Sequence, residues 1–426
     1  MPVKIRQVFY GWWIVAILVL ISAYFVGIIF FSFTALIQPI IAEFGWSYAQ
    51  VSFAMSFRGM EMGLLAPVVG LLVDRFGSRK PLIGGIIICG LGLFALSRIT
   101  SLGQFYMVFI LISAGTSACT GVIPLTVVGN WFRKKVSIAT GIVVCGSAIG
   151  GLFVPLVTWA IDMLGWRMTM VAIAAIAWIV FIPVSLLVRH TPEQYGYVPD
   201  GIIDIKPAQN KEQLSISEND VSIGVKQSVK SRAFWQVSLT FVFHMMVTGA
   251  VITHVMPYLN NIGISRSTSS FMATGIPLMT IVGRLGFGWF GDRYDKRWTT
   301  AMAFVLLSLG LLMFNYISST GLWLLVLFLI IFGIGYGGPV TMLAALIREY
   351  FGRAKLGTII GLVTGVATLG SIIGPPLAGW IFDSFGSYRP AWFIMAGISV
   401  AGIFVIATAP SFSAFKQKAA SINQSI

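Results

Sequence analysis

The sequence predicts an all-α membrane protein with twelve transmembrane helices in two pseudo-symmetric six-helix bundles. Two observations support this prediction: a composition that needs lipid as its solvent, and an internal repeat. Of the 426 residues, 57% are hydrophobic and only 10% are charged, whereas a soluble domain carries roughly a quarter charged residues. The chain therefore has too few charges to cover a soluble surface of its size.

The repeat is clearest at two polar segments that follow long apolar stretches. From Gly70 the chain reads Gly-Leu-Leu-Val-Asp-Arg-Phe-Gly-Ser-Arg-Lys, and from Gly288, which is 218 positions later, it reads Gly-Trp-Phe-Gly-Asp-Arg-Tyr-Asp-Lys-Arg. Pro39 and Pro257 have the same spacing. A repeat of this length in an apolar chain indicates two related helical bundles, an arrangement found in many secondary transporters.

The apolar stretches define the expected helices, since crossing the hydrocarbon takes about 20 apolar residues. Twelve stretches qualify: 9–33, 48–73, 81–99, 103–131, 137–161, 167–188, 233–259, 267–291, 299–317, 322–347, 357–382 and 389–410. The predicted organisation is an N-terminal bundle over 1–188, a cytoplasmic linker over 189–232, a C-terminal bundle over 233–410 and a cytoplasmic tail over 411–426. The linker is the only long polar segment, and a short surface helix is compatible with its composition.

The basic residues indicate the orientation of the chain. With the N-terminus in the cytoplasm, 22 of the 28 Lys and Arg residues fall in cytoplasmic segments. The others are Arg98, Arg167, Arg266 and Arg389 outside, and Arg58 and Arg284 within spans. This bias predicts that both termini lie in the cytoplasm of a multi-pass protein of the cell membrane. It also explains the net charge of +14 without a nucleic-acid partner.

Enzymatic and metal-dependent functions find no support in the sequence. Cys89, Cys119 and Cys145 fall in predicted spans, and no CxxC or His/Cys cluster is present. The predicted loops other than the linker are short, which leaves no room for an extramembranous catalytic domain. We therefore predict no enzyme activity, no cofactor and no metal. The expected partners are a small substrate, the lipid bilayer and, as an open alternative, protons, with a monomer as the functional unit.

The loop motif Gly-x-x-x-Asp-Arg-x-Gly-x-Arg-Lys, present twice among twelve spans, resembles that of the major facilitator superfamily over residues 8–410. Tyr10-Gly-Trp-Trp and Trp131-Phe-Arg-Lys-Lys-Val-Ser-Ile-Ala-Thr-Gly141 are similar to motifs of the monocarboxylate transporter family. The bacterial oxalate/formate antiporters share much of this pattern. The segment from Thr191, Thr-Pro-Glu-Gln-Tyr-Gly-Tyr-Val-Pro-Asp-Gly, is similar to bacterial members and points to a bacterial inner membrane.

The chain departs from these families at three places. Monocarboxylate transporters carry an Asp one turn before the arginine of the eighth helix, where this chain has Thr280. They also carry a lysine in the first helix, whereas residues 9–36 contain no basic residue. The lysine that oxalate antiporters use in the eleventh helix has no counterpart between Lys355 and Arg389. These departures place the usual proton coupling, and dianion binding by two cations, in question.

Charged residues inside a membrane are costly and therefore suggest function. Arg284 lies eight residues before Asp292, which places it about 12 Å along the helix from the loop. Its forked guanidinium suits a carboxylate, and the family resemblance implies an essential arginine there. Snorkelling to the headgroups is the structural alternative. Arg58 and Glu61, three residues apart, share a helix face and can form a structural pair, or bind substrate and a proton.

Further candidates are weaker. His244 and His254 in the seventh helix could relay protons, since histidine titrates in the physiological range, and His254 could also contact substrate. Polar groups on helices expected to line a cavity are Tyr24, Ser117, Thr120, Tyr258, Tyr336 and Thr364. The repeated loop motif, Gly70, Asp74 and Arg75 with Gly288, Asp292 and Arg293, is expected to form the charge network of an inner gate.

The leading functional hypothesis is a secondary active transporter of small organic anions, most of all monocarboxylates such as lactate or pyruvate, working by alternating access. Proton symport is compatible with it. The alternatives within transport are an oxalate/formate-type anion antiporter and a drug or sugar carrier of the same superfamily. A drug exporter favours embedded acids over embedded arginines, and a sugar carrier favours more Asn and Gln within spans. Outside transport, a membrane sensor would need a soluble domain.

Overall fold

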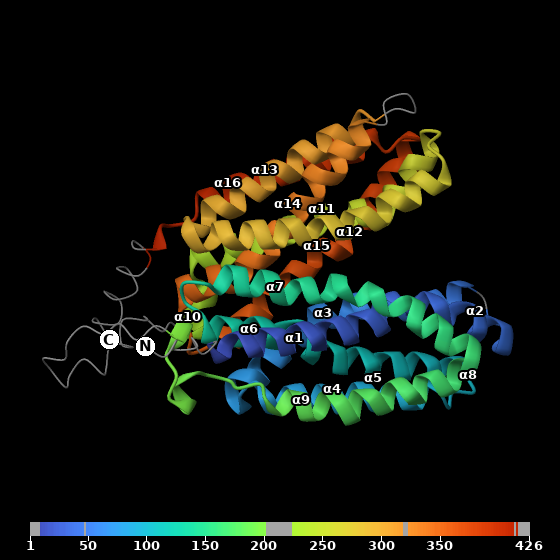
Figure 1. Ribbon diagram of the computed structural model, residues 1–426. Helices are drawn as coiled ribbons and strands as arrows, with labels where there is room; N and C mark the ends of the chain where they lie inside the picture. Colours follow the sequence, from blue (N-terminus) through green and yellow to red (C-terminus); the bar gives the residue numbers. More distant parts are fainter. Residues whose placement is uncertain (1–8, 47, 202–223, 318–322, 413–414, 416–426) are drawn as a thin grey trace, which may run out of the picture.

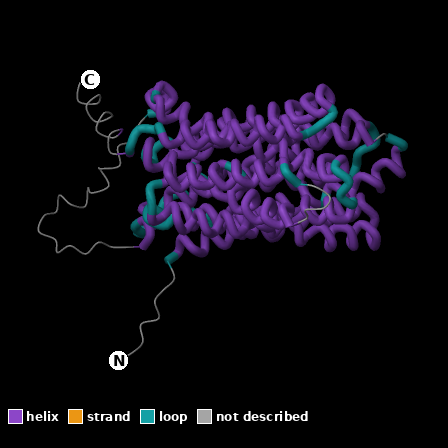
Figure 2. The backbone as a smooth tube through the Cα atoms, turned by 90° about the horizontal axis from the view of Figure 1, so that it is seen from above, coloured by secondary structure: helices purple, strands orange, loops and turns teal. Residues whose placement is uncertain are grey.

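The computed structural model describes residues 9–46, 48–201, 224–317, 323–412 and 415, apart from the side chains at positions 34, 38, 48, 49, 52–63, 266, 267, 270 and 273. Every regular element in these ranges is a helix. Figure 2 shows that the long helices run along a common direction and that the loops gather at the two ends. The predicted all-α fold is therefore confirmed.

The N-terminal bundle contains the elements α1 to α9. They are α1 (Tyr10–Val26), the π-helix η1 (Gly27–Phe31), α2 (Phe33–Phe44), α3 (Tyr48–Phe76), α4 (Arg79–Leu96), α5 (Leu102–Thr120), α6 (Val122–Trp131), α7 (Val136–Ile149), the 3₁₀-helix η2 (Gly150–Leu152), α8 (Phe153–Ile176), the π-helix η3 (Ala177–Phe181) and α9 (Ile182–Leu186). They make six crossings, because α8 reverses at Gly165, which has a φ of 75° and a ψ of 154°. Only glycine adopts such angles readily.

The C-terminal bundle has one long helix for each crossing. The six helices are α11 (Arg232–Asn261), α12 (Arg266–Arg293), α13 (Lys296–Asn315), α14 (Trp323–Phe351), α15 (Leu356–Phe385) and α16 (Arg389–Ala407). Two 3₁₀ turns, η4 (Glu193–Tyr195) and η5 (Pro199–Gly201), and the short helix α10 (Val225–Lys230) lie between the bundles in sequence.

The predicted spans correspond to these elements. Nine helical segments of the described chain are long and apolar enough to cross a membrane, and one of them, Val136–Leu186, contains two crossings. The helices α3 and α12, with 29 and 28 residues, complete the set of twelve. The first span was predicted to end at residue 33, but its helix continues to Phe44, because η1 joins α1 to α2 without a loop.

The two bundles lie against each other at one end of the molecule and splay apart toward the other (Figure 1). The closed end carries the α3–α4, α6–α7, α12–α13 and α14–α15 loops, with Arg75, Arg133, Arg293 and Arg353 among their residues or next to them. We call this end the basic face. The bundles pack through α3 against α15 and through α7 against α12. The arrangement places the repeated motif at the junction of the two bundles.

Glycine allows the bundles to touch through their backbones. A Cβ atom at Gly70 on α3 would collide with the carbonyl oxygen of Gly357, and one at Gly288 on α12 would lie 2.9 Å from Cα of Ile138. Small residues at such crossings let membrane helices approach closely. The glycines of the repeated motif therefore set the distance between the bundles.

Candidate functional site

Asp74, at the end of α3, links the two bundles at the basic face. Its carboxylate accepts hydrogen bonds from the backbone N–H groups of Gly357 (3.0 Å) and Thr358 (2.8 Å) and from the Thr358 hydroxyl. These residues open α15, and the first N–H groups of a helix have no partner within the helix. A carboxylate there is stabilised by these donors and by the helix dipole.

Asp292, at the end of α12, makes the equivalent contact in the opposite direction. Its two oxygens accept hydrogen bonds from the backbone N–H groups of Ser137 (2.7 Å) and Ile138 (3.0 Å), at the start of α7. Each bundle therefore supplies a carboxylate that caps a helix of the other. We call these two contacts the reciprocal caps.

The two arginines that follow these aspartates take a different position. Arg75 is exposed with its guanidinium 5.3 Å from the centre of the Phe76 ring, and that of Arg293 lies 3.7 Å from the centre of the Trp289 ring. The expected charge network is therefore corrected. In the described part of the chain, the cross-bundle partners of Asp74 and Asp292 are main-chain amides and a hydroxyl, and ion pairs with Arg75 or Arg293 are not among them.

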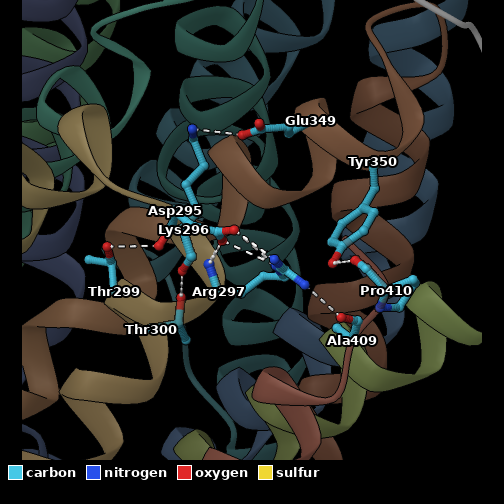
Figure 3. A network of polar contacts seen from close by, with 9 residues as sticks. All are labelled: Asp295, Lys296, Arg297, Thr299, Thr300, Glu349, Tyr350, Ala409 and Pro410. Atoms are coloured by element: carbon cyan, nitrogen blue, oxygen red, sulfur yellow. Dashed lines mark hydrogen bonds and ion pairs between the residues drawn. The ribbon is translucent and has the colours of Figure 1, made fainter. Parts of the chain in front are cut away.

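A further arginine of the motif ties each bundle to the end of its own last helix. Arg79 Nε donates to the carbonyl of Val188 (3.2 Å), and Arg297 donates to that of Ala409 (2.8 Å). Figure 3 shows Arg297 held between Ala409 and Asp295, whose carboxylate lies 2.7 Å from the guanidinium. Burial raises the pKa of Asp295, but the hydrogen bonds from Arg297 and the positive charges of Arg297 and Lys296 together leave the pKa below its usual value.

The first part of the predicted linker packs onto the basic face. Glu193 forms an ion pair with Arg353 of the other bundle at 2.7 Å, and His190 Nδ1 lies 2.8 Å from the Ser78 hydroxyl. Burial lowers the pKa of His190; Asp74 and Glu193 oppose this shift, and Arg353 adds to it. Sequence reasoning missed these contacts, because the segment reads as polar and carries no periodicity.

Arg284, on α12, reaches across the junction of the bundles. Its guanidinium donates to the carbonyl of Val144 (2.8 Å) and to the Ser147 hydroxyl (3.2 Å), both in the α7 crossing. Its Nε atom is buried without a hydrogen-bond partner in the described structure. A Cβ atom at Gly141 on α7 would lie 2.6 Å from the carbonyl oxygen of Arg284, so α7 passes close to the backbone of α12. The side chain thus turns toward the neighbouring bundle.

Two predicted residues lie near this guanidinium. His244 on α11 and Tyr336 on α14 are close enough to Arg284 for electrostatic interaction, and their rings are 5.7 Å apart. His244 is fully buried, and neither ring nitrogen has a hydrogen-bond partner in the described structure. The hydroxyl of Thr364 on α15 is also buried without a partner there. Arg284, His244 and Tyr336 form the candidate site.

Three predicted residues are not brought to this site. The hydroxyl of Tyr24 donates to the carbonyl of Ile173 (2.6 Å), and that of Tyr258 donates to the carbonyl of Phe314 (2.8 Å). Both tyrosines are nearly fully buried inside their own bundle. In this structure each hydroxyl joins two helices of its own bundle, and substrate contact by either tyrosine stays a prediction.

His254 is the third of these residues. Its Nε2 lies 2.9 Å from the carbonyl oxygen of Pro375, and its Nδ1 lies 3.1 Å from the Tyr388 hydroxyl. A carbonyl only accepts, so Nε2 carries a proton. His254 also lies ten residues beyond His244, about 15 Å along α11. These contacts connect α11 to α15 and to the residue before α16, and a transport role for His254 stays a prediction.

The remaining predicted residues give less information. Ser117 is buried in α5, and the Thr120 hydroxyl donates to the carbonyl of Thr116 (3.0 Å). The side chains of Arg58 and Glu61 lie outside the described residues, although the backbone of both belongs to α3. Their pairing stays a prediction.

The geometry of two six-helix bundles around a buried arginine agrees with the comparisons with known proteins. The model of the Major Facilitator Superfamily matches residues 13–262 and 237–423. The chain belongs to the Major Facilitator Superfamily. Its members are carriers rather than enzymes, so this chain is a multi-pass membrane transporter for a small molecule.

Similar proteins in this superfamily include monocarboxylate transporters. The chain is 24% identical to monocarboxylate transporter 13 of Bos taurus, over 95% of this chain and 91% of the relative. It is also 24% identical to human monocarboxylate transporter 2, over 92% and 84% of the two chains. The resemblance to this family is therefore confirmed at the level of similar sequences.

Solved structures confirm the fold. The human organic anion transporter MFSD10 aligns with a TM-score of 0.70 at 12% identity, over 93% of this chain and 99% of that one. The E. coli fucose:proton symporter aligns with a TM-score of 0.66 at 14% identity, over 94% and 99%. The transporter thus shares its architecture with carriers of different substrates.

Proposed function

We propose that this transporter carries small organic monoanions, with monocarboxylates such as lactate or pyruvate as its substrates, by alternating access between the two bundles. The observation that supports this proposal is Arg284, a cation buried at the junction of the bundles, whose Nε has no hydrogen-bond partner among the described residues. A guanidinium offers parallel N–H groups that match a carboxylate. The similarity to monocarboxylate transporters supports the same substrate class.

The location of Arg284 suits alternating access. It belongs to α12 but donates to Val144 and Ser147 of the α7 crossing. A carboxylate that takes over these donors would remove a link between the bundles. Substrate binding and movement of the bundles are therefore coupled through one side chain in this proposal.

We assign the basic face to the cytoplasm and the chain to a bacterial inner membrane, following the positive-inside bias of its loops. With this orientation, the reciprocal caps close the cytoplasmic side. The structure then corresponds to a state whose access is from outside, and opening toward the cytoplasm requires both caps to break.

The number of embedded cations supports preference for monoanions. Arg284 is one cation, and Arg58 is offset in this proposal by Glu61. Thr280 stands where monocarboxylate transporters carry an Asp, so any coupled proton uses His244, Glu61 or the carboxyl group of the substrate. A dianion brings a second charge that lacks a partner, and burying it costs several kcal/mol. Strong dianion transport would favour the alternative, an oxalate/formate-type antiporter.

The test is uptake of labelled lactate into proteoliposomes, with unlabelled pyruvate, oxalate and malate as competitors at several pH values. Arg284→Ala should weaken substrate binding at least about tenfold, since a charge-assisted hydrogen bond contributes roughly 1.5–3 kcal/mol. Arg284→Lys should not restore it, because an ammonium lacks the fork. Arg98→Ala, which removes an exposed arginine at the other end of the molecule, is the control. Wild-type uptake by Arg284→Ala, or strong competition by oxalate at neutral pH, would overturn the proposal.

A further inference from the structure

A cavity of about 820 Å³ opens on the basic face, away from Arg284. Its walls come from four parts of the chain: residues 74–80 around the α3–α4 loop, Asn130 of α6, the packed segment between 188 and 195, and Arg353 with Ala354 of the α14–α15 loop. The cavity therefore spans both bundles. Its volume falls in the range of small-molecule sites, roughly 300–1,000 Å³.

The lining of the cavity carries a net positive charge, and its carboxylates are already bonded within the protein. Four cationic side chains line the cavity, Arg75, Arg79, Lys80 and Arg353, against the carboxylates of Asp74 and Glu193. Both carboxylates are already engaged. Asp74 caps α15, and Glu193 accepts two hydrogen bonds from Arg353, at 2.7 and 3.1 Å.

The cations retain donors for a ligand: even Arg353, whose terminal nitrogens both donate to Glu193, has a buried Nε without a hydrogen-bond partner in the described structure. Arg79 uses Nε on the carbonyl of Val188, and its two terminal nitrogens have no hydrogen-bond partner among the described residues. Arg75 and Lys80 are exposed. Guanidinium and ammonium groups at several points around one cavity favour a ligand with several anionic oxygens, and phosphate groups provide these.

We propose that this cavity is a binding site for a phosphate-bearing ligand that holds the basic face closed. Arg79 and Lys80 belong to the N-terminal bundle, whereas Arg353 belongs to the C-terminal bundle. A ligand held by both sets binds the closed arrangement better than one in which the bundles have separated. Such differential affinity shifts the population toward the closed state. This inference is independent of the transported substrate.

Two sources can supply the phosphate chemistry. A soluble phosphorylated compound can enter from the aqueous phase. A phospholipid headgroup can also reach the cavity, since exposed apolar side chains of α3, Val68, Leu71, Leu72 and Phe76, lead to its rim. These residues recur at the three- and four-residue spacing of one helix face.

The experiment uses the full chain in phosphatidylcholine nanodiscs. One arm titrates sodium pyrophosphate by calorimetry, and the other replaces part of the lipid with cardiolipin. In both arms, the distance between nitroxide labels at Arg133→Cys and Trp298→Cys, one on each bundle at the basic face, reports closure. The native cysteines are buried, which favours labelling of the introduced pair alone.

The expected result is that at least one probe stabilises the short distance in the wild type. Arg75→Gln combined with Lys80→Gln should weaken this effect at least about tenfold, because both are charged contacts. Lys134→Gln combined with Lys135→Gln removes the same charge from exposed positions on the same face and should change it less than about twofold. A response to pyrophosphate identifies a soluble ligand, and a response to cardiolipin alone identifies a headgroup. The proposal is overturned if neither probe shifts the distance, or if the two double variants weaken the effect equally.

Discussion

Replacing Asp74 with Asn should open the basic face. The carboxylate accepts hydrogen bonds from Gly357 on one oxygen and from Thr358 on the other. An amide keeps only one oxygen, so its NH₂ group must face a backbone N–H. The variant loses about one hydrogen bond to a charged acceptor, roughly 1.5–3 kcal/mol, and a charge–dipole interaction of about 0.3–1 kcal/mol. A loss of about 2 kcal/mol raises the ratio of open to closed molecules about 30-fold.

The assay is the nitroxide distance between the basic-face ends of the two bundles, measured without substrate. The expected outcome is a longer-distance population in Asp74→Asn, and the same change in Asp292→Asn, because the reciprocal caps have the same geometry. Asp162→Asn is the matched control. Asp162 is an exposed carboxylate on α8, three residues before the reversal at Gly165 and away from the basic face. An unchanged distance distribution in both cap variants would show that the caps do not hold the closed state.

Two further predictions concern the same face. Gly70→Val should also favour the open state, since its side chain would collide with the Gly357 carbonyl, whereas Gly84→Ala, with nothing within 4 Å of its Cβ, should leave the distance distribution unchanged; a closed Gly70→Val would contradict the close approach. His190→Gln should flatten the pH dependence of the melting temperature below pH about 6.5, the usual pKa of histidine. Burial lowers the pKa of His190 in the folded state, so the folded protein favours the neutral imidazole. The stability that His190 contributes to folding is therefore complete above that pH and is lost as the pH falls. Equal slopes in the variant and the wild type would refute this explanation.

The sequence was a reliable guide to the fold because hydropathy and the repeat depend on many residues at once. Twelve apolar stretches and a motif repeated at Gly70 and Gly288 lead directly to two bundles. The same spacing placed Arg284 within its span. The helix boundaries were less predictable, because η1 carries α1 into α2 without any polar break.

The contacts of the candidate site could be predicted only in part. Apart from the Thr358 hydroxyl, the partners of Asp74 and Asp292 across the junction are backbone amides, which have no residue type to recognise in a sequence. The partners of the Tyr24 and Tyr258 hydroxyls could not be predicted, because a tyrosine on a membrane helix satisfies its hydroxyl equally well with a carbonyl of its own bundle. Which face of the helix meets that neighbour is decided by packing.

Buried histidines show the same limit. His244 and His254 lie on one helix, yet one has no hydrogen-bond partner in the described structure and the other has two. Composition and spacing treat them alike. The difference comes from the carbonyl of Pro375 and the hydroxyl of Tyr388, which belong to helices more than a hundred residues away in the chain.

The reciprocal caps also describe how the two halves of this chain relate as molecules. Asp74 contacts the start of α15, and Asp292 contacts the start of α7, so the same patch of each half meets the same patch of the other. This is the geometry of an isologous contact between two subunits related by a twofold axis. Neither half carries the carboxylate that caps its own helix. The fused chain thus keeps, inside one polypeptide, the interface of a symmetric dimer of six-helix units.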